Sequence, residues 1–136
     1  MKTLNTILLI DDDETTNYLN HRLLSRMNVA PDIRVVTNGE EAIEYLNKAF
    51  AAVEDYPLPE LIFVDIKMSV MDGFEFLEEY QQFPEEQKRQ IVMLMLTSSA
   101  SFYDLEKLKA FPDVRQHFSK PLAEGDVREL LQTYFG

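Results

Sequence analysis

Residues 6–13 read Thr-Ile-Leu-Leu-Ile-Asp-Asp-Asp, a short apolar run that ends in three consecutive aspartates. Continuous runs of branched residues are typical of strands buried on both faces of a parallel sheet. Residues 61–65, Leu-Ile-Phe-Val-Asp, repeat this pattern. If the two strands are neighbours, their carboxyl ends bring Asp11, Asp12 and Asp65 together at the edge where open α/β sheets bind ligands.

Strand-like and helix-like segments alternate five times along the chain. The expected strands cover about 6–10, 33–36, 61–64, 91–96 and 115–118. Between them apolar residues recur at helical spacing: Leu19, Leu23 and Met27; Ala42, Ile43, Leu46, Phe50 and Val53 after an N-cap at Asn38; Phe74 and Leu77; Leu105 and Leu108; and Val127, Leu130, Leu131 and Tyr134. This order predicts a doubly wound α/β fold, with a parallel sheet, helices on both faces and right-handed crossovers.

The composition limits the class of protein. A chain of 136 residues without a break in composition predicts one domain over 1–136, with its core at about 5–135 and no output domain. A formal charge of −11 argues against non-specific binding of nucleic acid. The sequence shows no signal peptide and no apolar stretch long enough to span a membrane, and it has no cysteine. We therefore expect a cytoplasmic protein without thiol chemistry or disulfides.

The aspartates at the strand ends favour a metal and a phosphoryl group. Clustered carboxylates repel one another unless a cation or proton intervenes. Mg²⁺ typically binds one or two carboxylates together with waters and phosphate oxygens, and Asp12 and Asp65 could supply the carboxylates. Asp65 alone is either a capping aspartate or a nucleophile that accepts a phosphoryl group. Asp13 better suits the start of the first helix, where a negative side chain favours the dipole.

Thr97 and Lys120 stand at the carboxyl ends of the two later expected strands. A hydroxyl can donate a hydrogen bond to a phosphoryl oxygen, and an ammonium supplies a compact positive charge. Such groups stabilise the charge on a phosphoryl group in transfer. Either residue alone could be a helix-start hydroxyl or a surface lysine. Strand ends that carry Asp-Asp, Asp, Thr and Lys in this order are much less expected by chance.

Together these residues resemble the receiver domain of two-component response regulators, over residues 5–135. The motifs are Leu-Leu-Ile-Asp-Asp-Asp at 8–13, Val-Asp-Ile-Lys-Met-Ser-Val-Met-Asp-Gly at 64–73, Leu-Thr-Ser at 96–98 and Lys-Pro at 120–121. The resemblance implies a CheY-like, flavodoxin-like (βα)5 fold whose five parallel strands have the order 2-1-3-4-5.

The resemblance also implies roles for the site residues. Asp65 would accept the phosphoryl group from a histidine kinase or a histidine phosphotransfer protein. Mg²⁺, with Mn²⁺ as an alternative, would be held by Asp12, Asp65 and the backbone carbonyl of Lys67, with Asp11 acting through water. Thr97 and Lys120 would contact the phosphoryl group.

A switch is implied as well. Thr97 and Lys120 would move toward the phosphoryl oxygens and change the face formed by the fourth expected helix, the fifth strand and the fifth helix, where a downstream protein would bind. The family often has an aromatic switch residue three positions before the lysine, which is His117 here. Because strand side chains alternate faces, Phe118 cannot replace it without a shift in register. His117 is therefore either a partly exposed strand residue or the switch itself.

The chain departs from the family pattern after Asp65. Ser69 stands where proline is usual, so this loop is expected to be less rigid. Lys67 and Ser99 occupy positions that, in the family, lie beside the path of the water that hydrolyses the acyl phosphate. The resemblance further implies a cis bond between Lys120 and Pro121. We hypothesise that Lys67 affects the lifetime of the phosphorylated state.

These features predict a stand-alone signalling receiver rather than an enzyme. A Mg²⁺-dependent phosphatase or phosphotransferase on a similar fold would want a second carboxylate two residues after the nucleophile, where this chain has Lys67. A receiver-like binding module that is not regulated by phosphorylation is a second alternative. Flavin binding is a third, and the aspartates after the first strand would repel the flavin phosphate.

Overall fold

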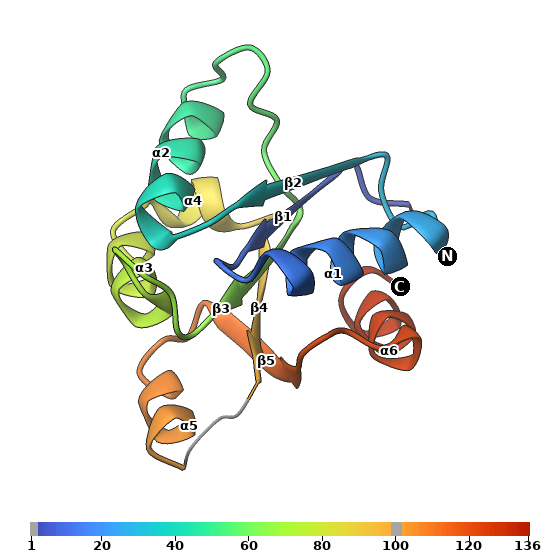
Figure 1. Ribbon diagram of the computed structural model, residues 1–136. Helices are drawn as coiled ribbons and strands as arrows, with labels where there is room; N and C mark the ends of the chain where they lie inside the picture. The colour runs from blue at the N-terminus through green and yellow to red at the C-terminus, as the bar shows by residue number, and fades with distance from the viewer. Residues whose placement is uncertain (1–2, 99–101) are drawn as a thin grey trace.

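The computed structural model describes residues 3–98 and 102–136, and these residues form five strands and six helices. The strands are β1 (Thr6–Ile10), β2 (Asp32–Val36), β3 (Leu61–Asp65), β4 (Val92–Thr97) and β5 (Val114–Ser119). The helices are α1 (Glu14–Arg26), α2 (Gly39–Phe50), α3 (Gly73–Tyr80), α4 (Glu85–Lys88), α5 (Phe102–Leu108) and α6 (Glu124–Phe135). All the strands are parallel, in the order β2-β1-β3-β4-β5 (Figure 1). The predicted fold class and strand order are confirmed.

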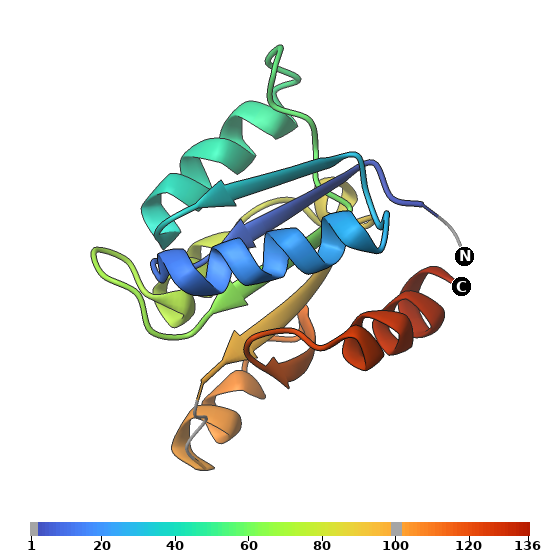
Figure 2. The ribbon, with the colours of Figure 1, turned by 45° about the vertical axis from the view of Figure 1, so that its right-hand side comes forward.

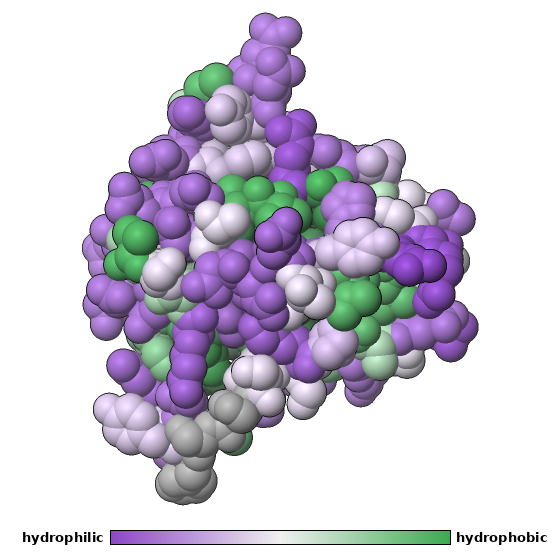
Figure 3. Space-filling view, in the orientation of Figure 1, coloured by the Kyte–Doolittle hydropathy of each residue, from purple (hydrophilic) through white to green (hydrophobic). Residues whose placement is uncertain are grey.

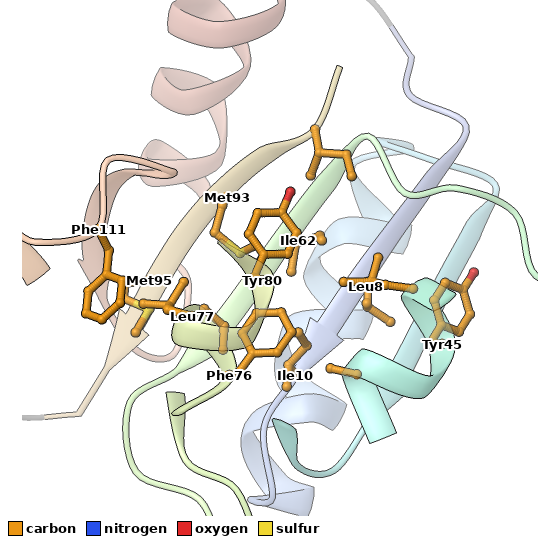
Figure 4. Packing of buried hydrophobic residues seen from close by; sticks show 14 of the residues in the cluster. Leu8, Ile10, Tyr45, Ile62, Phe76, Leu77, Tyr80, Met93, Met95 and Phe111 are labelled. Atoms are coloured by element: carbon orange, nitrogen blue, oxygen red, sulfur yellow. The ribbon is translucent and has the colours of Figure 1, made fainter. Parts of the chain in front are cut away.

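The helices cover the sheet on both faces. α1 and α6 lie on one face, while α2, α3 and α5 lie on the other (Figures 1 and 2). Each face has its own apolar core, and Figure 4 shows the one beneath α2 and α3, where Phe76, Leu77 and Tyr80 pack on Leu8, Ile10 and Ile62. The residues of β1 and β3 are all buried. The continuous apolar runs of the sequence thus reflect strands that are covered on both sides.

Aspartate and asparagine side chains begin three of the helices. Asp13 accepts a hydrogen bond from the Thr15 amide at 3.2 Å, and Asn38 accepts one from the Glu41 amide at 2.9 Å. Asp72 caps α3 in a reciprocal capping box with Glu75. These bonds satisfy amides that have no partner within the helix. The helix-start roles predicted for Asp13 and Asn38 are confirmed.

Two residues expected on buried helix faces are exposed, so those expectations were wrong. α2 ends at Phe50, and Val53 lies beyond it with 44% of its surface exposed. The chain turns there because Ala52 and Asp55 adopt positive φ angles of 58° and 71°. Leu19 of α1 is 41% exposed, since the buried face of that helix includes polar residues instead.

The short helix α4 was not expected from the apolar pattern. It has four residues, too few to show a helical period, and Pro84 stands at its N-cap. β4 also begins one residue later than predicted and includes Thr97. Pro at the start of a helix costs no hydrogen bond, because the first amides have no partner within the helix in any case.

None of the described helices is both long and apolar enough to cross a lipid bilayer. The face seen in Figure 3 is mainly hydrophilic, with separate apolar patches. Among the side chains that the structure describes, the most exposed large apolar ones are Val70 at 73% and Tyr103 at 71%. Isolated exposed apolar residues of this kind are ordinary on a protein surface.

Gly73 is the residue at which the loop after β3 turns into α3, and a larger residue should not fit. Its amide donates to the Ile66 carbonyl at 2.8 Å, and an added Cβ would lie 2.4 Å from the Asp65 carbonyl oxygen. We expect Gly73→Ala to lower the free energy of unfolding by about 2–3 kcal/mol in urea denaturation. Gly125→Ala is the matched control, because a Cβ there would meet no described atom within 4 Å. Equal stabilities of the two variants would contradict this packing.

Candidate functional site

Three carboxylates lie together where β1 and β3 end. Ile10 pairs with Val64 in the sheet, so the next residues, Asp11 and Asp65, leave adjacent strands at the same level. Carboxylate oxygens of Asp11, Asp12 and Asp65 lie within 4.8 Å of one another. Asp11 and Asp65 are buried and Asp12 is exposed. The structure therefore brings together the aspartates that the sequence pattern singled out.

Lys120 lies between the two buried carboxylates. Its Nζ is 3.0 Å from Asp11 Oδ2 and 3.0 Å from Asp65 Oδ2, and 9% of its side chain is exposed. It comes from the end of β5, far from both aspartates in sequence. Three carboxylates and one ammonium leave two negative charges, which one divalent cation would balance. An all-oxygen set of this kind suits a hard ion such as Mg²⁺.

Burial and charge raise the pKa of Asp65. Burial of its carboxyl has the largest effect and the neighbouring Asp11 charge adds to it, while the hydrogen bond from Lys120 opposes both, which leaves the pKa at about 6. Burial alone would lower the pKa of Lys120, but its hydrogen bonds with Asp11 and Asp65 raise it overall. The ammonium is thus retained at neutral pH, and the Asp65 carboxylate is held in a site that disfavours its charge.

This raised pKa predicts how stability depends on pH in the metal-free protein. Because the folded state binds the Asp65 proton more tightly than the unfolded chain, the contribution of Asp65 to stability falls as the pH rises from about 4 to about 6. We expect a loss of about 1–2 kcal/mol in this window from Asp65. Urea denaturation with a chelator, in the wild type and in Asp65→Asn, isolates this contribution as the difference. A difference that is constant with pH would contradict the prediction.

Thr97 ends β4 beside the lysine. It is buried, and its backbone carbonyl accepts a hydrogen bond from the Lys120 amide at 3.0 Å. The Lys120–Pro121 bond is cis, as predicted. The ends of β4 and β5 are therefore linked at the residues expected to contact a phosphoryl group.

The loop between β3 and α3 is held from two sides. The Ser69 amide donates to Asp12 Oδ2 at 3.1 Å, and the Met71 carbonyl accepts from the Gly39 amide at 2.9 Å. Val70 has a positive φ of 68°, which is unusual for a branched residue. Lys67 is exposed in the same loop, whereas Ser99 lies outside the described residues. The loop in which Ser69 stands at the position of the usual proline is thus anchored by hydrogen bonds to neighbouring elements.

His117 and Phe118 lie on opposite faces of β5. His117 is exposed and lines a surface hollow with Leu105 and Leu108 of α5. Phe118 is 7% exposed and belongs to the core beneath α1 and α6. This alternation is what the strand period requires. The exposed position of His117 agrees with the interpretation that it is a surface residue of the strand. Its role as a switch stays a prediction.

Two asparagines of α1 hydrogen-bond to the backbone of segments that carry site residues, and the sequence pattern did not single them out. Asn17 Nδ2 donates to the Asp11 carbonyl at 2.8 Å, and Asn20 Oδ1 accepts from the Leu122 amide at 3.0 Å. The available signal was their spacing, because Asn17 and Asn20 fall in the same helical stripe as Leu24. A polar residue in a buried stripe indicates a specific hydrogen-bond partner.

Comparison with known proteins adds to this geometry. The family model described as the response regulator receiver domain matches residues 7–132. The crystal structure of a two-component response regulator from Cytophaga hutchinsonii is 30% identical in sequence, with a TM-score of 0.87 over 98% of both chains. A response regulator receiver protein from Dyadobacter fermentans is 27% identical, with a TM-score of 0.80 over 96% of this chain and 97% of the other.

A longer protein also contains a similar segment. The hybrid signal transduction histidine kinase L of Dictyostelium discoideum is 27% identical over 137 residues, which cover 98% of this chain. The matched segment makes up 7% of that kinase, so the chain spans a small part of its length.

Proposed function

The chain belongs to the response regulator receiver family, and we propose that it accepts a phosphoryl group on Asp65 from a histidine kinase or a histidine phosphotransfer protein. Receivers of this family are phosphoacceptor signalling modules rather than classical enzymes, and they interact with histidine kinases and downstream effectors. The observation that supports Asp65 most is its pairing with Lys120 at 3.0 Å, next to the buried carboxylate of Asp11. A carboxylate that merely capped a helix would need neither neighbour.

The proposed transfer forms one bond and breaks one. A carboxylate oxygen of Asp65 attacks the phosphorus of the donor phosphohistidine, in line with the leaving imidazole nitrogen. The phosphorus–nitrogen bond breaks, its electron pair stays on the imidazole, and the imidazole then takes a proton from the solvent. Asp65 must be ionised to attack, which a pKa of about 6 allows at neutral pH.

Lys120 and Thr97 are the groups that we expect to stabilise the phosphoryl oxygens. The lysine Nζ lies 3.0 Å from Asp65 Oδ2, so its charge lies beside the group to be transferred. Asp12, Asp65 and the Lys67 carbonyl would hold Mg²⁺ or Mn²⁺, with Asp11 acting through water. When bound, the ion would neutralise negative charge on the carboxylates and the phosphate.

We also propose that phosphorylation changes the α5–β5–α6 face, where a downstream protein would bind or receive the phosphoryl group. The hydrogen bond between the Lys120 amide and the Thr97 carbonyl supports this. Because this bond links the ends of β4 and β5, a movement of the backbone at one strand end would also move the other. His117 and the hollow that it shares with α5 lie on the surface that would respond.

A direct test uses a small phosphodonor and Mg²⁺. The wild type should gain one phosphate that is stable in acid and labile in base, which identifies an acyl phosphate. Asp65→Ala should gain none under the same conditions. An equally modified Asp65→Ala protein would exclude Asp65 as the acceptor.

The exposed side chain of Lys67 should affect how long the acyl phosphate lasts. It stands two residues after Asp65 in the loop that Ser69 and Met71 anchor. We expect Lys67→Ala to change the dephosphorylation rate by about threefold or more, because it alters charge and access for water at the site mouth. Phosphate release from the isolated phosphoprotein measures this rate. An unchanged rate would contradict the role of Lys67.

A further inference from the structure

α1 buries three polar side chains on the face that packs against the protein. Thr16 and Asn17 are each 7% exposed and Asn20 is 2% exposed. Burying a polar group costs free energy unless it is hydrogen-bonded, so the partners of these groups indicate why they are present. Thr16 donates to Asp13 within its own helix cap, at 2.6 Å. Asn17 instead donates to the carbonyl of Asp11, just after β1, and Asn20 accepts from the Leu122 amide in the β5–α6 connection.

The Asn20 bond joins segments that lie far apart in the sequence. Its Oδ1 accepts from the Leu122 amide at 3.0 Å, in a buried environment. α1 and α6 lie on the same side of the sheet, and the chain between β5 and α6 runs alongside α1 (Figures 1 and 2). Leu122 is itself 6% exposed and packs in the core that α1 and α6 share.

The segment 120–122 is thereby fixed at both ends. The Lys120 amide donates to the Thr97 carbonyl at 3.0 Å, and the Leu122 amide donates to Asn20. Between these bonds, the side chain of Lys120 leaves the backbone toward Asp11 and Asp65. A shift of the backbone here would move an ammonium that is placed 3.0 Å from each of two carboxylates.

We propose that Asn20 is a positioning residue for Lys120: through the Leu122 amide it holds the β5–α6 connection so that the ammonium meets the phosphoryl group on Asp65. The proposal rests on the phosphoacceptor function proposed above. Packing alone gives no reason for an amide here, because Leu23 and Leu24 show that apolar side chains suit this face. Without Asn20 the buried Leu122 amide would lose its partner, which is costly in itself and frees the segment next to the lysine.

The test compares Asn20→Ala with Leu23→Ala, which removes apolar packing beside Pro121 and Leu122 but leaves the hydrogen bond to the Leu122 amide in place. Phosphorylation by a small donor at saturating Mg²⁺, binding of beryllofluoride and binding of Mg²⁺ alone are measured below the Tm of each variant. We expect Asn20→Ala to slow phosphorylation and weaken beryllofluoride binding about tenfold, because a small displacement of a catalytic group lowers the reaction rate strongly. Its Mg²⁺ affinity should stay within about twofold, since Asp11, Asp12 and Asp65 are intact.

Rescue completes the test. Asn20→Asp keeps an accepting oxygen for the Leu122 amide and should restore most of the rate, and Asn20→Ser replaces Asn20→Ala if the alanine variant does not fold. Leu23→Ala should lower the Tm and keep the wild-type rate. An Asn20→Ala rate equal to that of the wild type, or to that of Leu23→Ala, would overturn the positioning role. A wild type that accepts no phosphate would instead overturn the proposed function.

Discussion

Asp65→Asn is expected to abolish phosphorylation and, at the same time, to make the protein more stable at neutral pH. The amide has nearly the shape of the carboxylate but cannot act as the nucleophile or carry its charge. In the wild type this charge is buried beside Asp11, which with burial raises the Asp65 pKa to about 6. Its removal should therefore raise the free energy of unfolding at pH 7 by about 1–2 kcal/mol in the metal-free protein.

The matched control for this variant is Asp13→Asn. Asp13 caps α1 through its side chain, and asparagine caps helices equally well. This control should keep both wild-type stability and phosphorylation. The expected pattern is thus gain of stability with loss of function at position 65 and neither at position 13. An Asp65→Asn protein that is less stable than the wild type at pH 7 would contradict the electrostatic account of the site.

Lys120→Met is expected to have the opposite effect on stability. It removes the ammonium that lies 3.0 Å from both Asp11 and Asp65 and leaves two buried carboxylates facing each other. Breaking a buried pair by deleting one partner typically costs about 3–5 kcal/mol, and we expect about 3 kcal/mol at pH 7. The loss should shrink toward pH 5, because protonation of Asp65 relieves the repulsion.

Phosphorylation should fall by about tenfold or more in the same variant, since the charge beside the phosphoryl oxygens is lost. Lys109→Met is the matched control: this lysine pairs with Glu106 at 2.9 Å, but 73% of its side chain is exposed. Exposed pairs contribute little, so both readouts should stay near the wild-type values. Urea denaturation and phosphorylation kinetics measure the two effects. Lys120→Met stability equal to that of Lys109→Met would exclude the bridging role of Lys120.

The sequence predicts most of the fold because the three central strands, β1, β3 and β4, are buried on both faces. The apolar runs that end at Ile10, at Val64 and near Thr97 have no polar interruption. The sequence therefore predicts both that these runs are strands and where their carboxyl ends lie. The parallel order then brings polar residues after these strands to one edge. Helix starts at Asp13 and Asn38 are equally visible, because capping depends on local residues.

The remaining features depend on tertiary contacts that leave little local signal. α4 is too short for a periodic pattern, and Val53 fits the period of α2 although the helix ends before it. The contacts of Lys120 with two aspartates could not be predicted from the sequence, because they depend on how the β5–α6 connection passes the site. Asn20 looks like an ordinary polar helix residue until its partner, 102 positions away, is known.

The central claim is that Asp65 carries the phosphoryl group, and one measurement tests it most directly. After reaction with a small phosphodonor and Mg²⁺, borohydride reduces an aspartyl phosphate to a stable alcohol, and mass spectrometry of peptides locates it. We predict that the reduced residue is found at position 65 and at no other aspartate. A reduced residue at Asp11, Asp12 or Asp13, or none in a protein that has gained phosphate, would contradict this account.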